Sequence, residues 1–174
     1  MMRKNPFKSN NMKISLLFFA CVFSGQAAMA QLKATAVCPP FTTDVMDGNV
    51  NGLYPRSAIE EIRTKFPCAT DIIEQASATT CAGVFFKTLG VYFYTERNYI
   101  EIGENYKGKL FPALMGVSRT TLFPLLGKPK LTDPGWEAFQ MGYGTLVLYY
   151  NKAGKVNKIQ ISTKATETLR LCEF

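Results

Sequence analysis

Residues 116–129 read GVSRTTLFPLLGKP, a short apolar run with helix-start and helix-stop residues at its two ends. Ser118 is of a type that caps helix N-termini, because its hydroxyl accepts a hydrogen bond from a free backbone amide. Gly127 is typical of the position after a helix, where positive φ is required, and Pro129 prevents continuation. Pro124 lies inside the run and removes one amide donor, so the sequence predicts a short or kinked helix.

An earlier stretch has a similar plan. Residues 57–60 read SAIE, the pattern of a capping box in which the serine and the glutamate each satisfy a free backbone amide. Apolar residues recur at helical spacing, at Ile59, Ile62 and Phe66. We therefore expect a first helix that begins here and ends before Pro67.

Runs rich in β-branched and aromatic residues follow each expected helix and predict strands. The runs are residues 83–86, 91–94 and 99–102 after the first helix, and residues 136–141, 145–150 and 156–162 after the second. In the last run, the two isoleucines face one side of the sheet, and Lys158 and Gln160 face the other. Residues 151–154, NKAG, predict a hairpin turn between the last two strands.

These elements predict an α+β fold of two tandem helix-plus-three-strand repeats, which form a curved antiparallel sheet with the helices on one face. Repeat 1 is assigned to residues 51–113 and repeat 2 to residues 114–174, in one compact domain. The aligned blocks are residues 52–62 with 116–126, and residues 90–94 with 144–148. Residues 31–50, rich in Pro, Gly and Asn, predict an irregular N-terminal segment. The alternative is chance similarity between two generic α+β stretches.

The first thirty residues have the composition of a secretory signal peptide. Basic residues precede an apolar run at residues 14–23, and residues 28–30, AMA, form a cleavage pattern. The run is too short to span a bilayer, which takes roughly 20 residues. We expect cleavage after Ala30 and a periplasmic or secreted protein without a transmembrane segment, whether translation starts at Met1 or Met12.

Cysteine usage agrees with export. Outside the leader, the chain has four cysteines: Cys38, Cys68, Cys81 and Cys172. An even number in an exported chain predicts two disulfides, and the count alone leaves three pairings open. Their irregular spacing predicts neither a metal site nor a redox motif. In the leader, Cys21 raises the alternative of a lipoprotein, but Phe18 and Phe19 are poor residues upstream of an acylated cysteine.

Charge and residue usage narrow the function classes. The leader contains four of the 20 Lys and Arg residues and no acidic residue, so removing it lowers the net charge from +7 to +3. No basic run remains, so no nucleic-acid partner is predicted. The chain contains no histidine, which excludes His-dependent nucleophiles and the commonest metal ligand. We predict that the protein is not an enzyme and has no cofactor.

The motif around residues 116–129 resembles that of the β-lactamase-inhibitor-protein-like superfamily, which includes the small lipoprotein BamE of outer-membrane assembly. The matching residues are Gly116, Ser118, Leu122, Leu126, Gly127 and Pro129, with Val117 in place of the usual methionine. The resemblance extends over about residues 52–162. It implies a Cys68–Cys81 bridge, as those inhibitors make within a repeat, and with it a Cys38–Cys172 bridge.

The sheet face opposite the expected core carries aromatic and polar side chains. We predict that six residues contact a protein partner: Tyr92, Tyr94, Tyr99, Trp136, Tyr143 and Lys158. The alternative is that the tyrosines are ordinary half-buried sheet residues, and that Trp136 fills the core. With the resemblance, this predicts an inhibitor or immunity protein that blocks a secreted hydrolase. Two other functions remain open, a non-enzymatic accessory of envelope assembly and a small-molecule carrier.

Overall fold

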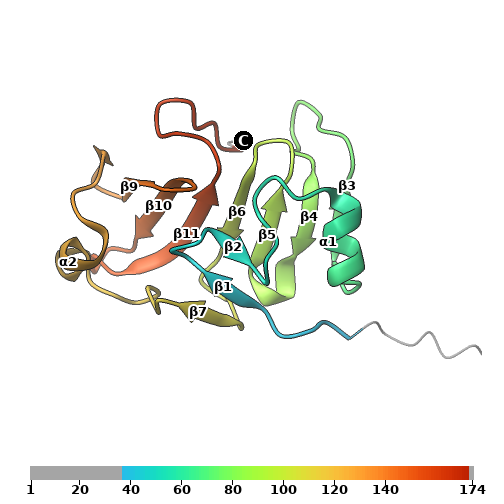
Figure 1. Ribbon diagram of the computed structural model, residues 1–174, viewed down its shortest axis with the longest axis horizontal. Helices are drawn as coiled ribbons and strands as arrows, with labels where there is room; N and C mark the ends of the chain where they lie inside the picture. Colours follow the sequence, from blue (N-terminus) through green and yellow to red (C-terminus); the bar gives the residue numbers. More distant parts are fainter. Residues whose placement is uncertain (1–36, 173–174) are drawn as a thin grey trace, which may run out of the picture. The chain divides into compact units, whose positions relative to one another are not determined.

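The computed structural model describes residues 37–172 of the chain (Figure 1). The predicted signal peptide at residues 1–30 and Cys21 lie outside the described residues. Within the described part, no helix has the length and apolar character needed to cross a membrane.

Eight strands form one antiparallel sheet in the order β3–β4–β5–β6–β11–β10–β9–β8. Their bounds are β3 (Asp71–Ile73), β4 (Gly83–Phe86), β5 (Val91–Tyr94), β6 (Tyr99–Ile102), β8 (Leu131–Thr132), β9 (Trp136–Met141), β10 (Gly144–Tyr150) and β11 (Val156–Ser162). The centre of the sheet is the β6–β11 pair, in which Ile100 lies opposite Ile161. All six strands predicted from β-branched and aromatic runs are confirmed, and Asn151 and Gly154 form the predicted hairpin turn through a backbone hydrogen bond of 2.9 Å.

A second sheet has three strands in the order β2–β1–β7: β1 (Thr42–Asp44), β2 (Asn49–Val50) and β7 (Lys109–Phe111). It lies across one face of the larger sheet (Figure 1). The prediction that residues 31–50 are irregular is therefore wrong for residues 42–44 and 49–50. β1 pairs in parallel with β7, so that Thr43 lies opposite Leu110. No local sequence pattern predicts a partner so far along the chain.

The first helix, α1 (Ile59–Lys65), ends before Pro67 as predicted, and Ile62 and Phe66 are buried. The capping-box prediction is wrong, because no side chain caps the helix. The Ser57 hydroxyl instead accepts a hydrogen bond from the Tyr54 amide at 3.2 Å, in the turn before the helix.

The second helical region is shorter still. A 3-10 turn, η2 (Arg119–Thr121), leads into α2 (Phe123–Leu126), which has only four residues and contains Pro124 in its first turn. The prediction of a short helix is confirmed, and Gly127 has the predicted positive φ of 72°. Ser118 makes no side-chain capping bond to the backbone.

The predicted fold class is wrong. The described residues are mostly β, with eleven strands in two sheets and only two short α-helices, not two helix-plus-three-strand repeats. The second helix has only four residues, and half of its expected apolar face is exposed: Leu122 and Leu126 pack on the core, but Phe123 is 58% exposed and Leu125 is 47% exposed. The three-stranded sheet covers the face of the eight-stranded sheet on which the helices were expected. Val50 of this smaller sheet belongs to the same core as Ile100 and Ile161.

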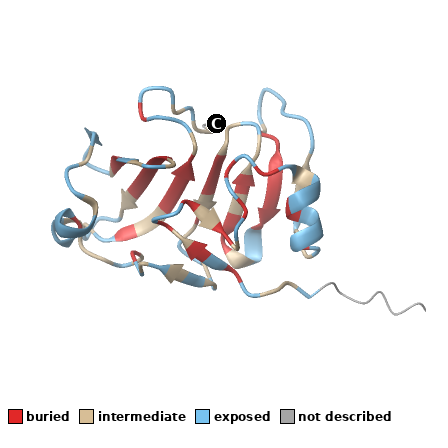
Figure 2. Ribbon diagram, viewed as in Figure 1, coloured by how far each residue is buried: buried red, intermediate tan, exposed pale blue. Residues whose placement is uncertain are grey.

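The core lies between the two sheets and α1, on what we call the inner face of the eight-stranded sheet. The buried apolar side chains form one cluster there, and Figure 2 shows the strands of the larger sheet largely coloured as buried. Phe86 is at the centre of an aromatic cluster, with ring centroids 5.1 Å from Phe41, 5.7 Å from Phe66 and 6.2 Å from Phe93. The cluster joins the N-terminal segment, the end of α1, β4 and β5.

Two disulfides connect Cys38 to Cys68 and Cys81 to Cys172, with Cα–Cα distances of 5.3 and 6.2 Å. Bonding of all four cysteines is confirmed, but the predicted Cys68–Cys81 and Cys38–Cys172 pairing is wrong. Stacking of Phe41 on Phe66, at 4.2 Å, holds the N-terminal segment beside the end of α1 and brings Cys38 to Cys68. Two disulfides fit a protein that matures in an oxidising compartment.

Candidate functional site

The outer face of the eight-stranded sheet, opposite the core, presents its side chains in three rows that cross the strands. The middle row is Phe85, Tyr92, Glu101, Gln160, Val147, Ala138 and Leu131. The row on one side is Tyr94, Tyr99, Ser162, Thr145 and Gln140. The row on the other side is Lys158, Tyr149 and Trp136. Aromatic side chains therefore lie on the outer face of five of these strands: β4, β5, β6, β9 and β10.

The chain after β11 crosses the row that contains Tyr99, and we call residues 163–172 the C-terminal strap. The Thr145 hydroxyl donates a hydrogen bond to the Lys164 carbonyl at 2.7 Å. The Cys172 amide donates to the Tyr99 hydroxyl at 3.2 Å, and the Cys81–Cys172 disulfide fixes the end of the strap. As a result Tyr99 is only 1% exposed. The middle row is also largely buried, at Phe85, Gln160, Val147 and Ala138. The more accessible residues of the other two rows are Leu131, which is exposed, and Tyr92, Glu101, Lys158, Tyr149 and Trp136, which are half-buried.

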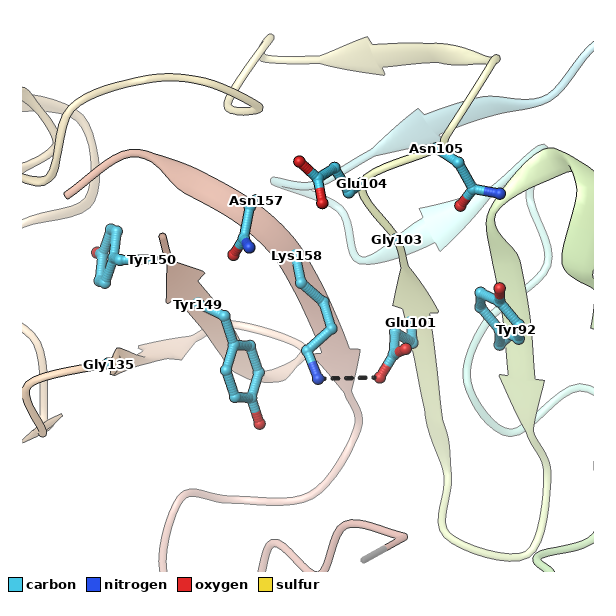
Figure 3. Close-up of a pocket in the computed structure, with 10 residues that line it drawn as sticks. All are labelled: Tyr92, Glu101, Gly103, Glu104, Asn105, Gly135, Tyr149, Tyr150, Asn157 and Lys158. Atoms are coloured by element: carbon cyan, nitrogen blue, oxygen red, sulfur yellow. Dashed lines mark ion pairs between the residues drawn. The ribbon is translucent and has the colours of Figure 1, made fainter. Parts of the chain in front are cut away.

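A connected group of polar side chains lies at the centre of the outer face. The Tyr149 hydroxyl donates to Gln160 Oε1 at 2.9 Å, and Gln160 Nε2 donates to Glu101 Oε2 at 2.8 Å. Lys158 Nζ lies 3.6 Å from the same Glu101 oxygen and 4.0 Å from the Tyr149 ring centroid (Figure 3). The Lys158 ammonium is therefore held by a carboxylate and an aromatic ring together.

These side chains border an open hollow of about 430 Å³, which we call the polar hollow. Its lining residues are Tyr92, Glu101, Gly103, Glu104, Asn105, Gly135, Tyr149, Tyr150, Asn157 and Lys158 (Figure 3). Three tyrosines, two carboxylates and one lysine meet there. The β5, β6, β10 and β11 strands and the loop after β6 position them.

A second hollow of about 270 Å³, the apolar hollow, also includes Tyr149 in its lining. Its other lining residues are Leu131, Trp136, Ala138, Val147, Thr166, Leu169 and Leu171. Trp136 and Tyr149 are cross-strand neighbours, and the last three of these residues come from the C-terminal strap. The outer face therefore has an apolar depression beside a polar one.

Only some of the six predicted contact residues line a hollow of the outer face. Tyr92 and Lys158 line the polar hollow, and Trp136 lines the apolar hollow. Tyr94 is half-buried and stacks on Tyr99 with a centroid separation of 4.4 Å, while Tyr99 itself lies under the strap.

Tyr143 does not belong to the outer face. It packs against the core, and its ring fills the space above Gly48, where a Cβ atom would lie 2.6 Å from Tyr143 Cγ. Burial raises the pKa of Tyr143, and the nearby Asp44 carboxylate adds to the increase. Gly48 and Tyr143 are far apart in sequence, so the local pattern around Tyr143 does not reveal this contact.

The sequence-based site prediction missed Tyr149 and the apolar side chains of the strap. Tyr149 could have been predicted from the sequence. It lies two residues after Val147 in the same strand, and because side chains alternate between the two faces of a sheet, both point to the outer face. No comparable signal existed for Leu169 and Leu171, because they lie beyond the last predicted strand.

A further charged group lies at the β9 end of the sheet. Arg119 Nη2 and Glu137 Oε1 are 2.9 Å apart, and the Tyr150 hydroxyl donates to Glu137 Oε2 at 2.6 Å. The Arg119 guanidinium also donates to the carbonyls of Asp133 and Pro134 at 3.2 and 3.3 Å. Both Glu137 oxygens are therefore satisfied, and the group connects η2 to the segment before β9.

Several tyrosines have a pKa above that of free tyrosine. Burial raises the pKa of Tyr94 to about 12, and the Glu101 carboxylate adds to the increase. Burial also raises the pKa of Tyr99, Tyr106 and Tyr150, and for Tyr150 the hydrogen bond to Glu137 acts in the same direction. The fold therefore favours neutral phenols.

We expect the protein to unfold as the pH rises from 10 through about 12, the pKa of Tyr94. An unfolded tyrosine ionises near pH 10, so above that pH the folded chain binds more protons than the unfolded chain. Stability is therefore complete below pH 10 and falls above it. Far-ultraviolet circular dichroism and tyrosinate absorbance should change together. Tyrosinate formation centred near pH 10 with an unchanged dichroism spectrum would contradict this prediction.

Comparison with known proteins gives no match: no protein-family model, curated protein or solved structure matches the chain. The resemblance to the β-lactamase-inhibitor-protein-like superfamily therefore stays a prediction. Within residues 37–172, no group of three His, Cys, Asp or Glu side chains has an arrangement that could hold a metal ion.

Proposed function

We propose that the protein is an exported inhibitor or immunity protein that binds a secreted hydrolase through the outer face of its eight-stranded sheet. The observation that carries the proposal is the adjacency of the apolar and polar hollows, which share Tyr149. Protein interfaces combine an apolar centre with a polar, hydrated rim in the same way.

Two features of the outer face suit a protein partner. Trp136 and Tyr149 are large aromatic side chains in neighbouring strands, the class of residue that contributes most binding energy at interfaces. The strap and the Cys81–Cys172 disulfide fix Leu169 and Leu171 beside them. Little conformational entropy is then lost on binding, because the surface is ordered beforehand.

The proposed mechanism is steric and needs no reacting group of the chain. The outer face would cover the catalytic cleft of the hydrolase, with a partner side chain in the apolar hollow beside Trp136. The disulfides suit this role, since an inhibitor of a secreted enzyme must hold its shape outside the cytoplasm.

The test is retention of a hydrolase on the immobilised, oxidised protein from culture medium and envelope extract, followed by an inhibition assay with the purified hydrolase. Stoichiometric inhibition supports the proposal. Retention of outer-membrane barrel proteins in its place would favour an accessory of envelope assembly. If no hydrolase is retained, or if a retained hydrolase stays fully active, the proposal is wrong.

Trp136→Ala is expected to weaken inhibition by about 30-fold, because it removes an aromatic side chain from the centre of the interface. The matched control is Tyr54→Ala, which truncates another accessible aromatic residue, 41% exposed, in the segment between β2 and α1. We expect the inhibition constant of the control to stay within about twofold of the unmodified protein. Equal effects of the two substitutions would rule out the outer face as the binding surface.

A further inference from the structure

The short helix α2 is apolar on its outer side as well as on its inner side. All four of its residues are apolar. Leu126 and the preceding Leu122 pack on the core, so the turn is fixed from its inner side. The residues between them, Phe123, Pro124 and Leu125, are exposed (Figure 2). Helices that are apolar all round are usually covered all round, so the outer side of α2 lacks a cover.

Four exposed lysines lie on the segments that border α2: Lys128, Lys130, Lys152 and Lys155. Two of them follow α2 directly, on the segment that leads into β8. The other two belong to the hairpin turn between β10 and β11. None of the four forms an ion pair with any residue of the described range 37–172. Their charges are therefore available to a partner.

Backbone contacts fix these lysines at both ends of the α2 segment. Before α2, Ser118 forms a β-bridge with Lys155, which joins the hairpin turn to the start of the helical region. After α2, the Lys130 amide donates a hydrogen bond to the Ala138 carbonyl of β9 at 2.7 Å. The exposed apolar turn is therefore bordered by cations on both sides, although the lysines are too far apart in sequence to form a basic run.

Charge is distributed unevenly along the eight-stranded sheet. Residues 37–104, which include α1 and β3 to β6, contain nine acidic and five basic residues. Residues 105–172, which include α2 and β8 to β11, contain three acidic and ten basic residues. Since α1 and α2 lie at opposite ends of this sheet (Figure 1), the end with α2 is positive. Such a charge distribution turns this end toward a negatively charged surface.

Few carboxylates oppose the four lysines. Of the three acidic residues in the range 105–172, Glu137 is buried and already paired within the chain. Asp133 and Glu167 are exposed. Hydrogen bonds to its own backbone and to Thr166 lower the pKa of Glu167, and the charge of Lys130 adds to this effect. Two exposed carboxylates therefore face four lysines, and the charge around α2 stays positive.

We propose that α2 and the four lysines form a docking surface for an anionic lipid bilayer. Phe123 and Leu125 enter the headgroup region, and the lysines bind lipid phosphates around them. The surface shares no residue with the polar hollow or the apolar hollow. The inference therefore goes beyond the proposed function and does not depend on it.

Other occupants would match only part of this surface. A nucleic acid supplies phosphates to the lysines, but it offers no apolar phase to the exposed side of α2. A second copy of the chain would bring two sets of lysines together, and like charges repel. An acidic protein would need an apolar pocket within its acidic surface. An anionic bilayer supplies phosphates and an apolar phase at the same interface.

The first test is co-sedimentation of the oxidised protein with lipid vesicles. One set of vesicles is phosphatidylcholine alone, and the other is equal parts of phosphatidylcholine and phosphatidylglycerol. We expect binding to the anionic vesicles that falls as the salt concentration rises, and little binding to phosphatidylcholine. No binding to the anionic vesicles at low salt, or equal binding to both sets, would overturn the inference.

The second test removes charge at two places. Lys128→Gln/Lys130→Gln should weaken binding to the anionic vesicles about 20-fold, because each lysine near an anionic surface contributes about fivefold. The matched control is Lys107→Gln/Lys109→Gln, which removes two exposed lysines with the same spacing at the start of β7. We expect less than about a twofold change in the control, since its lysines lie outside the docking surface. Equal effects would show attraction to the net charge of the chain alone, which would overturn the inference.

The third test leaves the charge unchanged. Phe123→Ala/Leu125→Ala should weaken binding to the anionic vesicles about tenfold, because less apolar area enters the bilayer. Tyr54→Ala, which truncates an exposed aromatic residue elsewhere, should bind as the unmodified protein does. Unchanged binding of the double variant would overturn the inference. So would a dimer of the unmodified protein, seen by analytical ultracentrifugation, that dissociates in the double variant, because a second copy would then cover α2.

Discussion

The Cys81→Ser/Cys172→Ser double variant is expected to lose about 4 to 5 kcal/mol of unfolding free energy. The bond joins residues 91 apart in sequence, and closing so long a loop removes much of the entropy of the unfolded chain. It also holds the end of the strap over Tyr99. Denaturant unfolding followed by circular dichroism gives the loss.

The control for this loss is the other disulfide. The Cys38→Ser/Cys68→Ser variant opens a loop with a sequence separation of only 30, for which chain entropy predicts about 3 to 4 kcal/mol. It leaves the strap in place, so Tyr99 should stay protected from iodination in this variant and become reactive in the first. An equal or smaller loss for Cys81→Ser/Cys172→Ser, with Tyr99 still protected, would show that the strap is held by its other contacts.

Phe86→Ala is expected to destabilise the protein by about 3 to 5 kcal/mol, the usual cost of deleting a buried phenylalanine ring. Phe86 is 0% exposed, and its ring contacts those of Phe41, Phe66 and Phe93. The cavity would therefore open where the N-terminal segment, α1 and the sheet meet. The measurement is the denaturant midpoint together with the slope of the transition.

Phe123→Ala serves as the matched control, because its ring is 58% exposed on α2. Surface truncations of this kind usually change stability by no more than about 0.5 kcal/mol. If Phe86→Ala cost less than about 1.5 kcal/mol, or if Phe123→Ala cost as much, the aromatic cluster would not be the main contact between the N-terminal segment and the sheet.

The sequence predicted those parts of the fold that local patterns encode. Alternation in residues 156–162 placed Ile159 and Ile161 on the face opposite Lys158 and Gln160, and the structure confirms both isoleucines as buried. The three-stranded sheet was missed because β1 is ordered by pairing with β7, more than sixty residues later. The disulfide pairing failed for a related reason, since it depends on where the N-terminal segment and the strap cross the sheet.

The candidate site shows the same division. Alternation placed Tyr92 and Lys158 on the outer face, where both line the polar hollow. Alternation also placed Tyr99 on the outer face, but it could not show that the C-terminal strap covers this residue. Tyr143, in the turn between β9 and β10, has no strand parity to indicate its direction, and its position depends on the absence of a side chain at Gly48.

The β6–β11 pairing has a consequence for biosynthesis. Glu101 and Gln160, 59 residues apart, meet across it, so β6 remains an open edge until the last strand has been synthesised. Contacts between such distant segments form slowly, because a long loop must close first. A newly made chain would therefore complete its sheet later than one built only from local hairpins.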